Sequence, residues 1–414
     1  MVGLIPTELG LLTDMYFIQF NSNALSGTIP SELEFCTGLE YLSMGFNNFT
    51  GTFPDWIGSM SSLRTLFLSN NFIGGSLPAT LSLATSLQTL AIDDNLLTGS
   101  IAPLNSLTNL MILYAEDNAF DMPISADTLE NLESLEELDL SNNNFHGNIP
   151  SHFFQYVNLT VLDLHRNSFT GILPAIMEKN PTLNILALHL NEGLTGTIPT
   201  SIVHLEALTH LDLTLTSFSG SMPRFLGDLT NLKYLFLAGV DFDQGRIPLR
   251  FAKLTNLVDL SLKSTNRNQV IPTWFGDMNY MKLLDLDSNR LKGTIPTELG
   301  NMVSLAYLFL NRNTLTGTIP TELGRRVFTL DAMVLDHNEI SGDATEVCRS
   351  FNYGIYLTTD CFNSTPVICP CCYECCDPKE PDCHSGDFFA YYDPIWETDF
   401  ERDAYRFYDF NITD

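Results

Sequence analysis

Apolar residues recur along the chain in a short pattern, LxxLxL, that starts again about every 24 residues. Within each copy, apolar and polar positions alternate, which predicts a short β-strand with one buried face. One strand in each copy of that length predicts a solenoid, in which each coil buries its apolar edge only against its neighbours. The fourteen copies begin at Met15, Leu39, Leu63, Leu87, Leu110, Leu135, Leu159, Leu183, Leu208, Leu232, Leu257, Met281, Leu305 and Leu330.

Asparagine stands eight residues after the first apolar residue in eleven of the fourteen copies, for example at Asn23 and Asn313. Because asparagine is a poor strand former, this column needs another cause. We expect each carboxamide to bond to backbone groups of the neighbouring coil at the turn after the strand. The copies that lack it follow one another, with Thr216, Val240 and Thr265 at this position.

The segment GTIPTELG occurs twice, at 293–300 and 317–324, and weaker copies precede it. Its first glycine suits a tight bend, and the proline fixes φ on the returning side of the coil. We expect the glycines of this segment to belong to the turns of the repeat. These residues build the coil, so any specificity for a ligand is expected from the variable side chains that the strands turn outward.

These elements resemble the plant-type leucine-rich repeat, LxxLxxLxLxxNxLxGxIPxxLGxL, of receptor-like kinase ectodomains, receptor-like proteins and polygalacturonase inhibitors. The resemblance runs from the start of the chain to about Gly342. It implies an α/β repeat solenoid, a right-handed curved horseshoe with a parallel β-sheet on its concave face. We expect a solenoid over 1–342 without its N-terminal cap, a cysteine-rich C-terminal cap over 343–385 and an acidic aromatic tail over 386–414.

The chain carries 49 acidic and 20 basic residues, a formal net charge of −29. This charge argues against nucleic acid and anionic membranes as partners and favours a basic ligand, with calcium as a further candidate. No apolar stretch is long enough to span a bilayer, and Met1 falls inside a repeat rather than in a signal peptide. We expect the natural protein to extend further, so a membrane anchor outside this chain stays open.

Eight of the nine cysteines follow the last repeat within a short segment. This density favours a disulfide-bonded cap and an oxidising, extracellular or cell-surface location; zinc binding in a cytoplasmic protein is the alternative, because Cys372 and Cys375 form a CxxC pair. The run CFNSTPVICPCCYECC also resembles secreted or membrane-anchored repeat proteins of diatom type. The eight cysteines are Cys348, Cys361, Cys369, Cys371, Cys372, Cys375, Cys376 and Cys383, and the glycosylation candidates are Asn48, Asn158, Asn363 and Asn411.

The sequence lacks the nucleophile-elbow, phosphate-loop, zincin and kinase motifs, so we expect neither an enzyme nor a bound cofactor or metal. Strand alternation instead predicts which side chains face a ligand. One group is acidic, since carboxylates held at strand spacing repel one another unless a cation or a proton relieves them. Its members are Glu116, Asp117, Glu136, Glu137 and Asp139, next to Asp93 and Asp94.

A second group is aromatic, with Tyr234 and Phe236 on one coil and Tyr307 and Phe309 on another. Aromatic side chains on a rigid scaffold commonly anchor proteins and peptides. His165 and His189 occupy equivalent positions on adjacent coils, where two imidazoles could share a metal, although such a pair is more often incidental.

Together these patterns predict a non-catalytic extracellular or cell-surface recognition protein of signalling or defence type. We expect a protein, peptide or glycan ligand on the concave face. A secreted inhibitor of polygalacturonase-inhibitor type is one alternative, and a structural matrix or adhesion protein is another.

Overall fold

The computed structural model describes residues 1–177, 180–326, 329–350, 356–361 and 367–376. It contains two compact units, unit 1 over Met1–Asn266 and unit 2 over Arg267–Asp414. The boundary falls within the predicted repeat region, after Asn266, which follows Thr265 in the last of the three copies without asparagine. The predicted tail over 386–414 lies outside the described residues.

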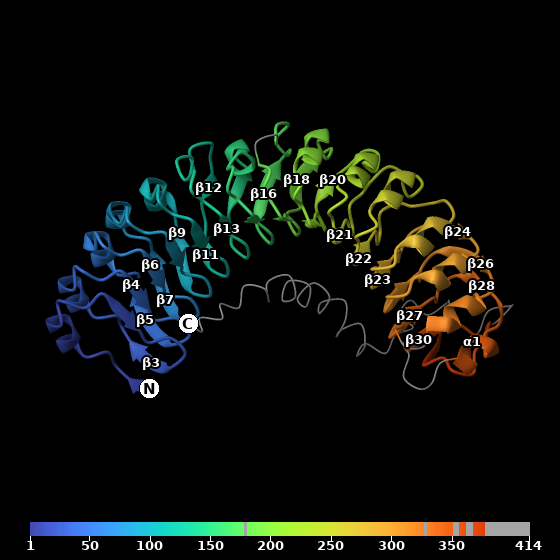
Figure 1. Cartoon of the computed structure of the whole chain (residues 1–414), viewed down its shortest axis with the longest axis horizontal. Coiled ribbons are helices and arrows are strands. Elements are labelled where there is room, and N and C mark those ends of the chain that lie inside the picture. The colour runs from blue at the N-terminus through green and yellow to red at the C-terminus, as the bar shows by residue number, and fades with distance from the viewer. Residues whose placement is uncertain (178–179, 327–328, 351–355, 362–366, 377–414) are drawn as a thin grey trace. The chain divides into compact units, whose positions relative to one another are not determined.

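Unit 1 is built on a parallel sheet that receives one short strand from each repeat (Figure 1). The middle residue of each strand is buried and pairs with the middle residue of the next, as Leu138 does with Leu162. The residues on either side of it turn to the opposite face, called here the sheet face. The strands in order are β2 (Phe17–Gln19), β4 (Tyr41–Ser43), β6 (Thr65–Phe67), β8 (Thr89–Ala91), β10 (Ile112–Tyr114), β13 (Glu137–Asp139), β15 (Val161–Asp163), β17 (Ile185–Ala187), β19 (His210–Asp212), β21 (Tyr234–Phe236) and β22 (Asp259–Ser261).

A second row of strands follows the turn after the main sheet. Its first sheet contains β1 (Val2–Gly3), β3 (Ala24–Gly27), β5 (Asn48–Thr52), β7 (Phe72–Ser76), β9 (Leu96–Gly99) and β11 (Ala119–Phe120). Its second contains β12 (Pro123–Ile124), β14 (His146–Asn148), β16 (Ser168–Gly171), β18 (Gly193–Gly196) and β20 (Ser217–Phe218). In the rest of unit 1, all of which is described, the row is reduced to one bridge between Gly220 and Phe242. The row therefore weakens where the asparagine is replaced.

In most repeats of unit 1, the chain returns through a short 3-10 helix. Proline precedes most of these helices, as Pro54 does at φ −65°, so the entry to the turn is fixed before it begins. A glycine inside several of them lets neighbouring coils approach closely. The helices are η1 (Thr7–Leu11), η2 (Ser31–Phe35), η3 (Asp55–Ser59), η4 (Ala79–Leu83), η5 (Ala102–Ser106), η6 (Ser151–Phe154), η7 (Thr200–His204), η8 (Arg224–Asp228) and η9 (Leu249–Lys253).

The two glycines of the GTIPTELG pattern have different roles. Gly293 has φ +79°, a left-handed conformation that favours glycine, at the predicted bend. Gly300 lies inside a 3-10 helix, and a Cβ built there would lie 2.5 Å from Cβ of Glu322 on the next coil. The assignment of every motif glycine to a turn was therefore wrong for the last one, which permits close packing between coils.

The asparagine column forms the predicted bonds between coils. Asn191 is fully buried; its Oδ1 accepts from the Phe169 amide at 3.0 Å, and its Nδ2 donates to the carbonyls of Leu164 at 2.9 Å and Leu188 at 3.0 Å. Where threonine stands instead, Thr216 donates one bond, to the Leu213 carbonyl at 2.7 Å. The column thus satisfies backbone groups that the short strands leave without a ladder partner.

A row of left-handed residues runs beside the asparagine column. The residue before the asparagine has positive φ in repeat after repeat, for example Phe46 at 55°, Asp117 at 50° and Arg166 at 48°. Few side chains other than glycine, asparagine and aspartate favour this region. The turn geometry therefore overrides the local preference of Phe46 and Arg166, whereas Asp117 suits it.

Unit 2 continues the same repeat pattern. Its main sheet contains β23 (Leu283–Asp285), β25 (Tyr307–Phe309), β27 (Ala332–Val334), β30 (Tyr356–Asp360) and β32 (Glu374–Cys376). The remaining elements are β24 (Lys292–Gly293), β26 (Thr314–Gly317), β28 (Glu339–Ile340), β29 (Gly342–Asp343), β31 (Val367–Ile368), η10 (Thr273–Asp277), η11 (Thr297–Asn301), η12 (Thr321–Arg326) and α1 (Thr345–Ser350). None of the helices in the described ranges has the length and hydropathy that a bilayer crossing needs.

Candidate functional site

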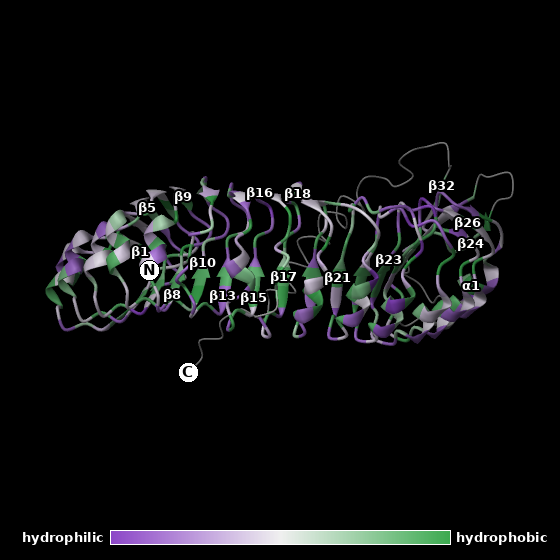
Figure 2. Ribbon diagram, turned by 90° about the horizontal axis from the view of Figure 1, so that it is seen from above, coloured by the Kyte–Doolittle hydropathy of each residue, from purple (hydrophilic) through white to green (hydrophobic). Residues whose placement is uncertain are grey.

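The sheet face of unit 1 concentrates acids and imidazoles over its middle strands. They come from the last residue of the strand or from the residue two positions beyond it. Successive strands lie side by side in the sheet (Figure 2), so residues at equivalent positions follow one another from coil to coil. We call these side chains the acid–imidazole row; its members are Asp93, Glu116, Asp139, Asp163, His165, His189 and Asp212.

The two imidazoles are held by carboxylates and by each other. Nδ1 of His165 lies 2.7 Å from Oδ1 of Asp163, and Nδ1 of His189 lies 3.3 Å from Oδ2 of Asp212. The rings stack with centroids 4.2 Å apart and planes inclined by 9°. Ring nitrogens of parallel stacked imidazoles point in parallel directions, so this arrangement does not direct two of them at one shared metal ion.

The carboxylates of the row are close enough to repel one another. Burial raises the pKa of Glu116 well above its usual range, and the charges of Asp139, Asp93 and Asp163 raise it further. Burial also raises the pKa of Asp139, and Asp163 adds to this effect, whereas His165 opposes it. Among the described residues, Oε2 of Glu116 and Oδ2 of Asp163 are buried oxygens that accept no hydrogen bond. The row is therefore short of positive charge and of donors.

The predicted acidic residues divide between the row and its borders. Glu116 and Asp139 belong to the row, while Glu136 precedes β13 and Asp117 is exposed at the left-handed turn after β10. Glu137 is half-buried and accepts a hydrogen bond from the Tyr114 hydroxyl. The structure thus brings together two of the five predicted acids.

The sequence interpretation separated the acids from the histidine pair, and the structure joins them. Asp139 and Asp163 are direct partners in the register of β13 and β15. The signal was present as LDL in two consecutive copies, at 138–140 and 162–164. The second of these copies contains Asp163, which the coils bury completely. The alternation of apolar and polar residues does not reveal this depth of burial.

A pH dependence of stability follows from the raised pKa values. Burial raises the pKa of Asp93 to about 6, with further contributions from Asp94 and Asp117 against an opposing hydrogen bond from Ser69. Between its ordinary pKa and its raised pKa, a carboxyl holds more protons in the folded than in the unfolded state. The stability that these groups contribute is therefore present at low pH and is lost as pH rises through the folded-state pKa.

We expect the double variant Glu116→Gln/Asp139→Asn to be more stable than the natural chain at pH 7, because burial and neighbouring carboxylates raise the pKa of both groups and the neutral amides remove the cost of ionising them in the folded state. The difference should shrink as pH falls through the ordinary carboxyl pKa values near 4, because the two groups then become protonated in the unfolded state as well. Urea denaturation at several pH values measures it. The control is Glu34→Gln/Asp55→Asn, which makes the same charge change at exposed positions of η2 and η3. A difference that does not vary with pH would contradict the assignment.

The predicted aromatic residues lie in both units. In unit 1, Tyr234 is half-buried and its ring stacks on His210 at 4.4 Å, while Phe236 is 8% exposed. In unit 2, the rings of Tyr307 and Phe309 are 6.4 Å apart. Tyr234 and Phe236 lie on the sheet face of unit 1, and Tyr307 and Phe309 lie on the sheet face of unit 2.

The aromatic residues near the start of the chain form the more accessible group. Phe17 is 48% exposed and its ring stacks on Tyr41 at 4.5 Å, and Phe67 lies 6.0 Å beyond Tyr41. The sheet face of unit 1 thus carries an aromatic patch over its first strands and the acid–imidazole row over its middle strands.

The cysteine-rich segment forms disulfides in the structure. The bonds join Cys348 to Cys371, Cys361 to Cys375, and Cys369 to Cys372. Cys376 ends β32, and Cys383 lies outside the described residues. Cys361 follows β30 and Cys375 lies in β32, so this disulfide joins two neighbouring strands of the unit 2 sheet.

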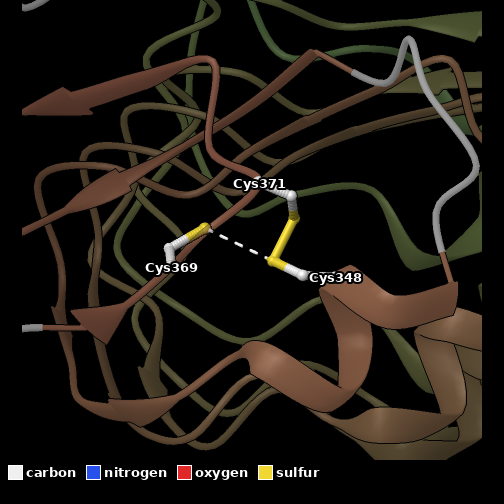
Figure 3. Close-up of side chains that lie close together, drawn as sticks. All are labelled: Cys348, Cys369 and Cys371. Atoms are coloured by element: carbon white, nitrogen blue, oxygen red, sulfur yellow. Dashed lines mark hydrogen bonds between the residues drawn. A yellow bond between two sulfur atoms is a disulfide. The ribbon is translucent and has the colours of Figure 1, made fainter.

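Metal ligands do not converge on the sheet face. Within the described part of the chain, the group whose three ligand atoms lie within 4.8 Å of one another is Cys348, Cys369 and Cys371 (Figure 3). All three sulfurs are in disulfides, which removes the thiolates that zinc binds. The geometry therefore favours the disulfide interpretation over zinc, and among the described residues no three carboxylates bring their oxygens within this distance.

Two of the four glycosylation candidates can be placed. Asn48 in β5 and Asn158 before β15 are both exposed. Asn363 and Asn411 lie outside the described residues.

A one-strand-per-coil solenoid with a side-chain-rich sheet face belongs to the class of repeat proteins that bind ligands on an extended surface. Residues 21–239 match the family model described as "Leucine-rich repeat region", and residues 255–315 match "Leucine rich repeat". The chain belongs to the leucine-rich repeat proteins. A comparison with curated proteins finds no match.

The solved structures to which this chain is similar include plant receptors. It is 29% identical to the plant peptide hormone receptor RGFR1, in complex with RGF2, over 87% of this chain and 62% of the receptor chain, with a TM-score of 0.76. It is 28% identical to PEPR1, in the crystal structure of PEPR1-AtPEP1, over 87% of this chain and 50% of the PEPR1 chain, with a TM-score of 0.79. The Leptospira interrogans repeat protein LIC12759 is 26% identical over 84% of this chain and 90% of its own, with a TM-score of 0.66. The chain thus spans less than two thirds of either receptor chain.

Proposed function

We propose that this chain is the recognition part of an extracellular or cell-surface leucine-rich repeat protein, and that it binds a peptide along the sheet face without catalysing a reaction. The observation that carries the proposal is the sheet face of unit 1, where an aromatic patch and a charged row lie on one rigid parallel sheet. An extended peptide can contact both groups, since each strand adds about 4.8 Å to the surface.

Similarity supports a peptide over other ligands. RGFR1 and PEPR1 are 29% and 28% identical to this chain over most of its length, and RGFR1 is a plant peptide hormone receptor. The fold is typical of binding proteins. Signalling or defence is the corresponding role, with protein and glycan ligands as the wider class.

Disulfides support the extracellular location. Three bonds form within the short segment that follows the repeats, and such density is typical of oxidising compartments. The alternatives of an enzyme inhibitor and of a matrix or adhesion protein use the same surface with a larger partner. No separate feature of the described residues favours either.

A peptide display selection tests the proposal. We expect a random library selected against the full chain at 150 mM NaCl to yield peptides whose binding falls at least tenfold in the variant Phe17→Ala/Tyr41→Ala, because aromatic anchors supply a large share of binding energy. The control, Leu83→Ala, removes an exposed apolar side chain from η4. Peptides that bind both variants equally, or a selection that enriches none, would contradict peptide binding on this face.

A further inference from the structure

We propose that Asn48 carries an N-linked glycan whose first N-acetylglucosamine unit packs on the exposed ring of Phe72 and on the adjoining Leu96. The inference rests on the extracellular location in the proposed function, because sequons are modified in secreted proteins. It concerns a second surface of unit 1, the outward face of β3, β5, β7 and β9, called here the lateral face.

Alternating burial defines the lateral face. In β5, β7 and β9 the second residue of the strand is buried, whereas the first residue is exposed. Since side chains alternate along a strand, the exposed residues point away from the core of the coil. The first residues are Asn48 in β5, Phe72 in β7 and Leu96 in β9, and these strands lie side by side (Figure 1).

Register places the sequon beside the aromatic ring. Thr50, the third residue of the sequon that begins at Asn48, is the direct partner of Phe72 in the pairing of β5 with β7. Gly74, the next outward residue of β7, is the partner of Leu96. Asn48 lies two residues before Thr50 on the same strand, so its side chain emerges on the same face as the ring of Phe72.

Two large apolar side chains of the lateral face are open to solvent. Phe72 is 54% exposed and Leu96 is 58% exposed. Contiguous apolar surface on a folded protein commonly marks a contact with another group. Here the acceptor asparagine of a sequon lies on the same face, so the covering group is one that the chain itself would carry.

Small residues leave space for a sugar next to Asn48. Its direct partner on β3 is Ser26, and Ala24 is the preceding outward residue of that strand. On β7, Gly74 follows Phe72 as the next outward residue and has no side chain. The positions beside Asn48 and beyond Phe72 therefore carry no bulky side chain.

The chemistry of N-acetylglucosamine suits this surface. Axial C–H groups make one face of the pyranose ring apolar, and the negative π face of an aromatic ring attracts such groups. The hydroxyl and acetamido groups at the edge of the sugar stay in water. Packing on Phe72 and Leu96 would thus remove apolar surface from water without burying a polar group that needs a partner.

The other sequon that can be placed differs in its surroundings. Asn158 is exposed in the turn before β15 rather than on a strand. The equivalent asparagine of another repeat helps to stack the coils, since Nδ2 of Asn109 donates to the Thr85 carbonyl at 2.8 Å. A role within the repeat thus accounts for asparagine at 158, and Asn158 serves as the matched comparison for Asn48.

Expression of the full chain with a cleaved secretion signal in a eukaryotic host tests the site. Peptide mapping by mass spectrometry measures how much of each sequon is modified. We expect Asn48 to be modified in most molecules, because the folded chain accommodates a sugar at this position. An unmodified Asn48 in the secreted chain would overturn the site, whatever the state of Asn158.

A second experiment tests the contact between sugar and ring. The chain is produced with the other three sequons removed, in a host that adds high-mannose glycans, and is trimmed by endoglycosidase H to one isotope-labelled N-acetylglucosamine. We expect the ring current of Phe72 to move the C–H resonances of the sugar upfield of their positions in denatured protein. Phe72→Ser should abolish this shift.

Phe46→Ser is the control for the contact. Phe46 is 57% exposed like Phe72, but it lies in the turn before β5 rather than on the lateral face. The upfield shift should survive this substitution. A shift that persists in Phe72→Ser, or one that is lost only in Phe46→Ser, would overturn packing on the lateral face.

Hydrogen exchange measures what the contact does for the fold. With one sugar at Asn48, we expect the amides of β5, β7 and β9 to exchange about threefold more slowly than in Asn48→Gln, because the contact stabilises the closed state of these strands. The difference should disappear when Phe72→Ser is added to both forms. Equal exchange with and without the sugar would contradict a stabilising contact.

These outcomes are independent of peptide recognition. The peptide selection probes Phe17 and Tyr41 on the sheet face, whereas the glycan experiments probe the second row of strands. Selected peptides together with an unmodified Asn48 would overturn the glycan and leave peptide recognition intact. A modified Asn48 that packs on Phe72, together with a selection that enriches no peptide, would overturn peptide recognition alone.

Discussion

Replacing Asn191 by alanine is expected to lower the free energy of unfolding by about 4 kcal/mol, because three buried backbone groups lose their partners at about 1–3 kcal/mol each. Those groups are the Phe169 amide and the carbonyls of Leu164 and Leu188. Asn191→Thr should cost less, since threonine keeps one bond at the equivalent Thr216. Urea denaturation followed by circular dichroism measures the loss, and hydrogen exchange at Phe169 shows where it occurs.

The matched substitution is Asn144→Ala in the same unit. Asn144 is exposed, and its carboxamide accepts a long bond of 3.5 Å from the Ser168 hydroxyl. We expect a change within about 0.5 kcal/mol, as for most surface substitutions. If Asn191→Ala cost no more than Asn144→Ala, the column would not be the source of cohesion between coils.

Replacing Gly58 by alanine should be similarly severe. A Cβ there would lie 2.0 Å from the Thr80 carbonyl oxygen and 2.6 Å from its carbon, and backbone atoms cannot rotate away as a side chain can. The coils that carry η3 and η4 would have to separate, which places the cost at the upper end of overpacking, about 3 kcal/mol or more. A thermal melt of the full chain, with hydrogen exchange over η3 and η4, measures it.

Gly38→Ala is the corresponding control. The nearest atom to a Cβ at Gly38 is the Met15 carbonyl oxygen at 3.8 Å, an ordinary contact. This substitution should leave the melting temperature within experimental error or raise it slightly, since alanine restricts the unfolded chain. A similar loss from both substitutions would show that glycine at 58 is required for another reason.

The periodicity of the sequence contains most of the fold. Alternation around Leu138 and Leu162 is enough to predict parallel strands in register, and asparagine at Asn191 is enough to predict bonding between coils. These features depend on local pattern and on contacts between adjacent copies. In a repeat protein, contacts between adjacent copies make up most of the fold.

The remainder depends on distances that a pattern does not contain. The 2.5 Å approach of Gly300 to Glu322 follows from how closely the 3-10 helices stack, so the sequence suggested a turn instead. The cysteines allowed 105 pairings, and the choice among them required the positions of β30 and β32.

The acid–imidazole row needed both kinds of information. Sequence indicated Glu116, Asp139 and the histidine pair separately. The depth at which Asp163 is buried, and its missing hydrogen bond, came only from the folded coils.

The left-handed residues beside the asparagine column bear on the kinetics and selectivity of any partner that reaches them. Asp117 and Arg166 hold positive φ in the folded chain, so the cost of that conformation is met when the protein folds and not when a partner arrives. Residues in this left-handed row, called here the rim, have little backbone freedom left to lose when a partner binds. Exchanging one rim residue for another should therefore alter which partner is accepted while the rigidity of the contact stays the same, a useful property for repeats that diversify by substitution.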